Sequence, residues 1–237
     1  MISKYIIEFA IYSFFGWLWE SIFAVFKTGK WEARGFLSGP ICPIYGVSVA
    51  IGMVFYDTFV LNGIISLKVG QVFLFSIVVS AIVEYFTSWL LEVLFHAYWW
   101  DYKDTPLNIN GRVSVPTSLG FGVAGVLVVF YGIPFTHNLI VSIPALNREI
   151  IAYLIIIVLT MDVTITVNEL INLDMKVKAL DQGFNIRISN AVDTFFDKKN
   201  FVQQMVYSKI KGFKYPSNIT NRAKNFLIDV KNRVTRK

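Results

Sequence analysis

Five apolar stretches constrain the fold of this chain more than any single motif does. An α-helix needs about 20 apolar residues to cross about 30 Å of hydrocarbon. The candidate stretches cover approximately residues 4–26, 42–62, 70–98, 116–133 and 149–171. Hydrophobic residues make up 55% of the chain and charged residues only 16%, whereas soluble domains carry about 25% charged residues. The sequence therefore predicts an all-α integral membrane protein with about five transmembrane helices.

The ends of this pattern need separate interpretation. Pro134 and Pro144 bracket an apolar piece that is too short to span the membrane twice, so we predict an interfacial loop over residues 134–148. The first stretch lacks a basic n-region followed by a cleavage site, and it contains Glu8 and Glu20. We therefore interpret it as a retained span and not as a signal peptide.

Basic residues predict the orientation of the chain in the membrane. Residues 172–237 contain 14 Lys or Arg against five Asp and no Glu, a net charge of +9. Segments rich in Lys and Arg stay on the cytoplasmic side, so we expect a multi-pass protein of the cytoplasmic membrane with its C-terminus inside. With five spans, the segments 27–41 and 99–112 then also face the cytoplasm.

Two polar blocks interrupt the apolar pattern: residues 34–46, the first polar block, and residues 99–112, the second polar block. Irregular backbone at membrane depth persists only where protein or water satisfies its polar groups. We therefore expect two inner-side polar or re-entrant segments that contact each other. Pro40 and Pro43 should delay the second span until about Ile44, and the N-terminus of that helix could hold an anion.

Charged residues inside spans are costly in hydrocarbon and mark candidate functional positions. Glu20 lies near the inner end of the first span. On the third span, Glu84, Ser88 and Glu92 are spaced four apart and His96 continues the spacing, which predicts one polar face on a helix.

Arg34 and Arg112 are the candidate partners of these carboxylates, because the predicted topology places them on the same side. A guanidinium group can meet a carboxylate with two hydrogen bonds, so we predict that at least one arginine pairs with Glu20, Glu84 or Glu92. The candidate ligand-binding residues are Glu20, Arg34, Glu84, Glu92, His96, Asp101, Asn108, Asn110 and Arg112.

These residues allow three interpretations. The charge pairs could only fasten the polar blocks to the helices, they could line a site for a polar or anionic ligand, or they could act in catalysis. Glu92 and His96 offer two metal ligands without a third, so we predict no metal site and no cofactor, and we assign no catalytic residue. Asp162 and Glu169, seven apart on the last span, could form a proton relay or a helix contact beside Thr166.

The sequence predicts two domains: a transmembrane domain over residues 1–171 and a basic tail over residues 172–237. Apolar residues in the tail recur at spacings of three or four, which is typical of amphipathic helices. Such helices could lie on the anionic inner leaflet or dock on a partner protein. The apolar positions are Val177, Leu180, Phe184, Ile188, Val192 and Phe195, followed by Ala223, Phe226, Val230 and Val234.

Several short motifs occur in a distinctive order between residues 5 and 170. They are Gly16-Trp-Leu-Trp-Glu20, Arg34-Gly-Phe36, Gly39-Pro40, Pro43-Ile-Tyr-Gly46, Glu84-Tyr85, Glu92, Trp99-Trp-Asp-Tyr102, Asn108-Ile-Asn-Gly-Arg112 and Ser118-Leu-Gly-Phe-Gly122. In this order and spacing they resemble a bacterial membrane family, the type IV ABC-transporter permeases. The chain departs from the family pattern at Leu107 and at Val113-Ser-Val115, where the family often has an aromatic residue and a cysteine, so no thiol role carries over there.

The resemblance implies a permease, which would need a source of energy. The sequence has no Gly-rich stretch followed by Lys-Ser or Lys-Thr, so any ATPase would be a separate subunit. The other expected partner is the lipid bilayer, a homo-oligomer stays open, and no nucleic acid is expected.

The leading functional prediction is a transporter permease component for a small or anionic solute. A membrane-embedded enzyme acting on a lipid headgroup is the first alternative, with Glu92 or His96 as base and Arg34 and Arg112 holding phosphate. A scaffold that recruits a cytosolic partner through its basic tail is the second. Whether the chain is an enzyme stays open.

Overall fold

A computed structural model describes residues 2–32, 34–60, 68–179, 201–214 and 228 of the chain. Within these residues, four helices are long and apolar enough to cross a membrane. They are α1 (Ile2–Thr28), α3 (Val69–Phe95), the helical stretch Val115–Ser142, and α6 (Ala145–Ala179), of which Ala145–Met175 forms the apolar part. Four of the five predicted spans are thus present as long apolar helices.

The second predicted span forms a shorter helix. Helix α2 (Pro43–Phe55) continues into η1 (Tyr56–Val60), a π-helical turn. The apolar part, Pro43–Phe59, is shorter than the four long helices, so the count of five spans stays a prediction. The helix begins one residue from the expected start at Ile44, because proline fits the first turn, where no N–H partner is needed.

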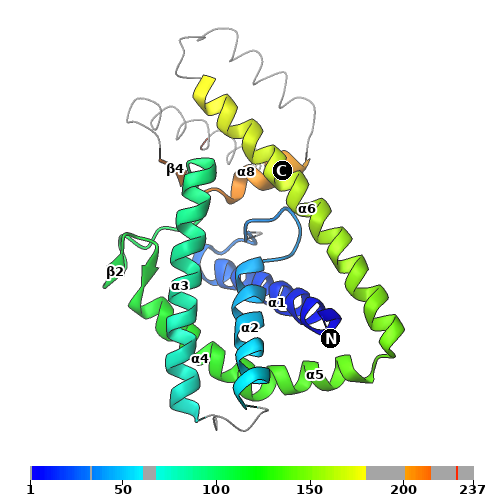
Figure 1. The fold of residues 1–237 in the computed structure, drawn as a ribbon. Coiled ribbons are helices and arrows are strands. Elements are labelled where there is room, and N and C mark those ends of the chain that lie inside the picture. Colours follow the sequence, from blue (N-terminus) through cyan, green and yellow to red (C-terminus); the bar gives the residue numbers. More distant parts are fainter. Residues whose placement is uncertain (1, 33, 61–67, 180–200, 215–227, 229–237) are drawn as a thin grey trace.

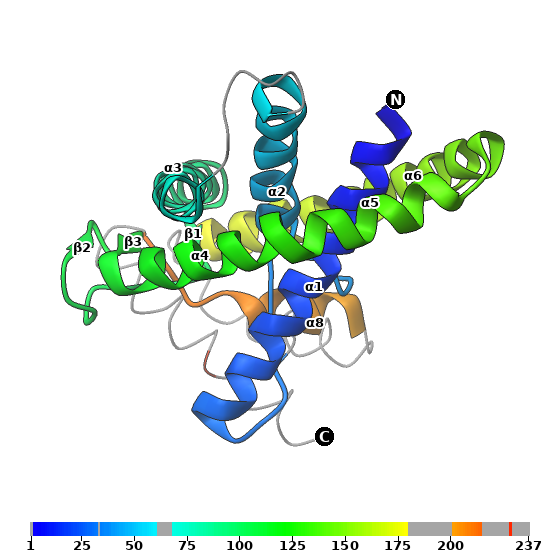
Figure 2. The ribbon, with the colours of Figure 1, turned by 90° about the horizontal axis from the view of Figure 1, so that it is seen from below.

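The interfacial loop predicted over residues 134–148 is wrong. Helix α4 (Val115–Leu127), the π-helical turn η2 (Val128–Gly132) and α5 (Ile133–Ser142) form one uninterrupted helical stretch, which crosses the view in Figure 2. The N–H of Ile133 donates to the carbonyl of Val128, so the hydrogen-bond register shifts just before Pro134. Proline has no N–H to donate to the preceding turn, so it is tolerated where the hydrogen-bond register shifts and no such bond is needed. The chain turns only at Pro144.

The long helices cross one another at large angles. Helix α3 is seen end-on in Figure 2, where α4 and α5 lie across the view. Helix α1 packs on α2, α5 and α6, and α3 packs on α4. Glycines allow the α1–α2 contact, because a Cβ at Gly16 would overlap the ring of Tyr45 and a Cβ at Gly46 would overlap Phe9 and Ser13. Small residues at such crossings are common in membrane proteins.

Two short two-stranded sheets form outside the long helices. Strand β1 (Ala97–Tyr98) pairs antiparallel with β4 (Gly212–Phe213), and β2 (Asn108–Ile109) pairs antiparallel with β3 (Val113–Ser114). Helix α8 (Phe201–Lys209) precedes β4 and packs on α6. Figure 1 shows α8 and β4 beside the ends of α3 and α6.

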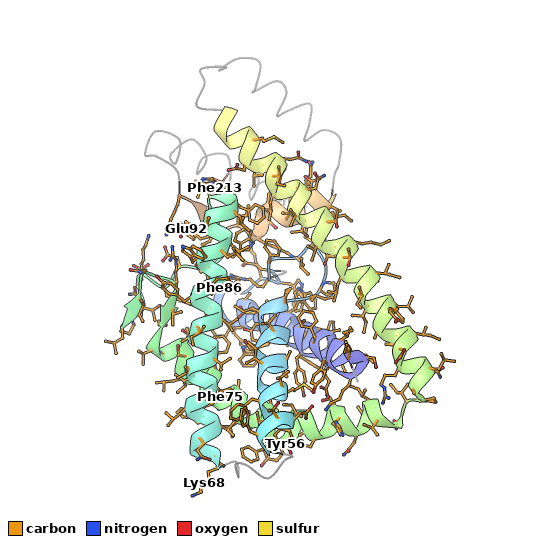
Figure 3. The ribbon with its side chains drawn as sticks, viewed as in Figure 1. Tyr56, Lys68, Phe75, Phe86, Glu92 and Phe213 are labelled. Atoms are coloured by element: carbon orange, nitrogen blue, oxygen red, sulfur yellow. The ribbon has the colours of Figure 1, made fainter. Side chains whose placement is uncertain are left out.

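The largest buried apolar cluster joins these C-terminal elements to the long helices. Tyr207 and Ile210 are fully buried in it. Figure 3 shows Phe213 and Glu92 together at one end of α3, far from Lys68 at the other end. The cluster consists of Leu91, Phe95, Ala97, Trp99, Leu170, Leu173, Val206, Tyr207, Ile210 and Phe213.

Residues 201–214, which we call the tail segment, therefore contribute to the core. The boundary between residues 171 and 172 stays a prediction, and α6 continues past it to Ala179, so that Val177 belongs to α6. The other apolar tail positions predicted as amphipathic helices, from Leu180 to Phe195 and from Ala223 to Val234, lie outside the described residues.

Candidate functional site

The second polar block folds mainly on itself. The side chain of Asn108 donates to the carbonyls of Lys103 at 3.1 Å and Thr105 at 2.9 Å, and it accepts the N–H of Gly111 at 3.0 Å. Asp101 accepts the N–H of Lys103 at 3.1 Å. Asn108 and Asp101 therefore shape the loop, and their polar groups are used within the block.

Glu92 has two cationic partners. Nη2 of Arg112 lies 2.8 Å from Oε2 of Glu92, and Nζ of Lys214 lies 2.6 Å from the same oxygen. The guanidinium also lies 5.2 Å from the centre of the Tyr85 ring. The Tyr85 hydroxyl accepts a hydrogen bond of 3.0 Å from the side-chain amide of Asn110. The prediction that Arg34 or Arg112 pairs with Glu20, Glu84 or Glu92 is confirmed by the Arg112–Glu92 pair. The hydrogen bond to Glu92 raises the pKa of Arg112, so this cation is permanent.

Arg34 is placed differently from the prediction. Its Nη2 lies 2.7 Å from Oε2 of Glu32, two residues away in the chain, so Arg34 has a local partner. The two arginines thus have different carboxylate partners, Glu32 for Arg34 and Glu92 for Arg112.

The backbone of the first polar block is bound by two charged side chains, Asp162 and Lys209. Asp162 on α6 accepts the N–H groups of Ser38 at 3.1 Å and Gly39 at 3.0 Å, and also the Ser38 hydroxyl. Thr166 accepts the Ser38 N–H at 3.0 Å. From the opposite side, the ammonium group of Lys209 donates to the carbonyls of Leu37 and, at 3.3 Å, Ser38. Asp162 thus makes a loop contact beside Thr166.

Lys209 is a buried cation with an unusual protonation equilibrium. Its residue is only 8% exposed, and this burial lowers the pKa of its ammonium group to about 8, although the charge of Asp162 acts in the opposite direction. The backbone of the first polar block therefore depends on a group that can lose its charge at mildly alkaline pH.

Each polar block contributes one tyrosine that binds a glutamate of a long helix, and the blocks contact each other where the Phe36 and Trp99 rings lie 5.5 Å apart. Tyr45 of the first block donates to Oε1 of Glu20 at 2.5 Å, and Tyr102 of the second block donates to Oε1 of Glu84 at 2.9 Å. The charges of Glu20 and Glu84 interact with each other, and the two tyrosines also interact electrostatically. We call these four residues the tyrosine–glutamate cluster.

This cluster combines access with unused hydrogen-bonding capacity. Glu20, Tyr45 and Tyr102 are half-buried. Glu84 is only 5% exposed, and its Oε2 has no hydrogen-bond partner in the described part of the chain. Burial raises the pKa of the Tyr102 hydroxyl, and the charge of Glu84 raises it further, so Tyr102 stays a hydrogen-bond donor. The cluster can therefore accept a ligand that donates hydrogen bonds or carries positive charge.

Cys42 lies beside this cluster but is not a nucleophile. Burial raises the pKa of its thiol to about 12, and the nearby charge of Glu20 adds to the effect. The reactive form of cysteine is the thiolate, so the thiol stays protonated and inert.

The predicted polar face of α3 ends before His96. Glu84 and Ser88 are buried, as the spacing indicated, but α3 ends at Phe95 and His96 caps it in a left-handed conformation with φ 51°. The chain turns there, and Nδ1 of His96 lies 3.2 Å from Oδ1 of Asp174 on α6. Glu92 and His96 therefore do not share a helical face. Among the residues that the structure describes, no group of three or more His, Cys, Asp or Glu could hold a metal ion.

Sequence reasoning missed Tyr45, Tyr102, Lys209 and Lys214. Tyrosines near span ends are common interfacial anchors, so neither Tyr45 nor Tyr102 stood out as a carboxylate partner. One signal was present: each polar block carries a tyrosine close to its Gly and Pro residues. The two lysines carried no such signal, because they lie more than 120 residues from their partners.

The comparison with known families agrees with this architecture. The family described as "Putative ABC-transporter type IV" matches residues 7–167, which include all four members of the tyrosine–glutamate cluster. The chain belongs to this family, and with its long apolar helices it is a multi-pass membrane protein that fits a membrane transporter component. No curated protein and no solved structure matches the chain. The tail segment lies outside the matched residues.

Proposed function

We propose that this chain is the membrane component of a transporter, and that the tyrosine–glutamate cluster receives its solute. The observation that carries the proposal is Oε2 of Glu84, which is buried beside the contact with Tyr102 and has no hydrogen-bond partner in the described residues. A buried acceptor without a donor costs about 1–3 kcal/mol. A solute that supplies the donor would recover that cost.

The charge of the cluster favours one class of solute. Glu20 and Glu84 are both acidic and interact with each other, and their tyrosine partners are neutral. We therefore propose a small polar solute with an amine or another cationic donor. The anionic solute expected from Arg34 and Arg112 has less support, because both arginines already have carboxylate partners. Glu32 pairs with Arg34, and Glu92 pairs with both Arg112 and Lys214.

Energy would come from a separate ATPase subunit. The family description names ABC transporters, and the sequence carries no P-loop. We propose that the subunit docks at the end of the molecule where both polar blocks and the tail segment lie. That end faces the cytoplasm in the predicted topology.

A ligand screen by thermal stabilisation tests the solute site. The purified full-length protein is heated with a panel of small amines, quaternary ammonium compounds, carboxylates, phosphates and sugars. One cationic compound should raise the melting temperature of the wild type, and a ligand at 100 times its Kd adds about 2.7 kcal/mol of stability. Glu84→Gln should abolish the shift. Glu149→Gln, a change at an exposed glutamate of α6, is the matched control and should retain it.

The result also has outcomes against the proposal. If a phosphate or carboxylate stabilises both the wild type and Glu84→Gln, the solute site would lie at the arginines and not at the tyrosine–glutamate cluster. A compound that binds at the cluster but does not cross proteoliposomes containing the protein and its co-purified ATPase would indicate a receptor and not a permease.

A further inference from the structure

A second polar group lies at the other end of α1, away from both polar blocks. Lys4, Glu8 and Tyr12 are spaced four apart and share one face of the helix. Asp57 in the π-helical turn η1 accepts the hydroxyl of Tyr5 and lies 3.3 Å from Nζ of Lys4. Tyr12 shares a hydrogen bond of 3.1 Å with Thr136 of α5.

Glu8 is the one member of this group without a partner in the described part of the chain. The residue is 0% exposed, and neither carboxylate oxygen has a hydrogen-bond donor there. Asp57 engages both the Lys4 ammonium and the Tyr5 hydroxyl. The ionised form of Glu8 would thus be a buried charge without hydrogen bonds, and such charges are far costlier than the neutral acid.

The surroundings of Glu8 differ from ordinary helix packing. Tyr12 belongs to a buried cluster with Met53 of α2 and Ile133 of α5, flanked by Val128 and Val129 of η2. The two π-helical turns, η1 and η2, thus both lie near this face of α1. Single π-helical turns inside helices occur frequently at functional sites, because they shift side chains out of the regular register.

We propose that Glu8 is a proton-binding site inside the membrane-spanning part of the protein, and that the Lys4–Asp57 pair tunes how readily its proton leaves. The carboxyl of Glu8 holds one proton in its neutral form, and release of that proton leaves a buried carboxylate. Lys4 lies about one helical turn from Glu8 on the same face of α1, and Asp57 lies 3.3 Å from Lys4. The Lys4 and Asp57 side chains are 17% and 24% exposed, so this charged pair lies nearer the surface than Glu8.

The release of this proton depends on the charges around Glu8. Lys4 favours the ionised form of its carboxyl and Asp57 disfavours it. The titratable groups on the elements packed against this part of α1 include Lys4, Tyr5 and Tyr12 on α1, Tyr56 and Asp57 on η1, Tyr131 on η2, His137 on α5, and Arg148, Glu149 and Tyr153 on α6.

Infrared spectroscopy of the full-length protein in lipid nanodiscs tests the proposal without a transport assay. A protonated carboxylic acid has a carbonyl stretch that is separate from the carboxylate bands. The wild type should show this band at neutral pH, Glu8→Gln should lose it, and the control Glu149→Gln should keep it. Equal bands in the wild type and Glu8→Gln would overturn the proposal.

A second variant keeps the test decisive if Glu8→Gln does not fold. Asp57→Asn retains Glu8 but removes the negative charge beside it, so the pH at which the band disappears should fall. An unchanged titration would overturn the role of the Lys4–Asp57 pair. Loss of the wild-type band on adding sodium ions, but not on adding choline at equal ionic strength, would show an alkali-cation site and not a proton site.

Discussion

Glu92 and Glu8 are both acidic residues of apolar helices, yet their surroundings are opposite. Glu92 lies at the end of α3 with two cations on one oxygen, whereas Glu8 is fully enclosed with no donor in the described residues. The difference separates two uses of a charge in a membrane protein. A carboxylate with fixed partners holds the fold together, and a carboxylate without partners is available for exchange.

The largest expected effect follows from removing Arg112. Breaking a buried ion pair typically costs about 3–5 kcal/mol. Because Lys214 remains and the Arg112 and Glu92 side chains are 13% and 21% exposed, we expect Arg112→Ala to lower the free energy of unfolding by about 2–3 kcal/mol. Unfolding followed by tryptophan fluorescence in detergent measures the change.

Two controls accompany this variant. Replacing Arg112 and Glu92 together by leucine should recover part of the loss, because no buried charge is then stranded. Lys214 loses its partner too, but its side chain is 39% exposed and can be hydrated. Lys103→Ala should cost less than about 1 kcal/mol, since the Lys103 side chain is 61% exposed. Wild-type stability of Arg112→Ala would mean that the Glu92 site does not hold the fold.

A direct comparison of the two acids gives the next largest effect. Glu92→Gln removes the charge from two hydrogen bonds and should cost about 1.5–3 kcal/mol. Glu8→Gln replaces the acid that we propose to be protonated by a neutral amide of similar shape, so its stability at neutral pH should stay within about 0.5 kcal/mol of wild type. The same unfolding assay ranks them, and the reverse order would show that the two acids have been assigned the wrong roles.

Lys209 is an intermediate case, a buried charge that does have acceptors. Its pKa is about 8 in the folded protein and about 10.4 in an unfolded chain. Between these values the unfolded state binds more protons, so the stability of the folded state rises with pH. The melting temperature of the wild type relative to Lys209→Met should therefore increase from pH 8 to pH 10. A constant difference across this range would show that Lys209 is not desolvated.

The smallest effect concerns Asn110, which has a left-handed backbone with φ 54°. Asn110→Ala loses the hydrogen bond to Tyr85 and places a Cβ in a conformation that alanine avoids. Asn110→Gly loses only the bond. We expect the alanine variant to be less stable than the glycine variant by about 1 kcal/mol, measured by chemical denaturation. Equal stabilities would indicate that this turn relaxes.

The apolar pattern was enough to predict most of the fold. Composition and run length locate the long helices, and the two prolines locate the start of α2. The loop expected after Pro134 failed for a physical reason, because a π-helical turn shifts the hydrogen-bond register where the proline N–H is missing. A pattern of apolar residues contains no information about such a shift.

Only part of the candidate site could be predicted. The pairing of Arg112 with Glu92 followed from opposite charges on one side of the membrane. Arg34 shows the limit of that argument, because Glu32 is two residues away and needs no long-range folding to reach it. The tyrosine partners of Glu20 and Glu84 were missed since neutral hydroxyls do not reveal their acceptors in a sequence.

The contacts of Asp162 and Lys209 with the first polar block have a consequence for biogenesis. The backbone N–H and carbonyl groups of Ser38 are bound by Asp162 and Lys209, which the ribosome adds long after residue 38. During synthesis, residues 34–46 must therefore wait at the membrane with these groups hydrated or held by other factors until the tail segment arrives. A nascent chain that stops before Lys209 would keep its helices and lack this closure, so protease sensitivity near Ser38 would report how far assembly had proceeded.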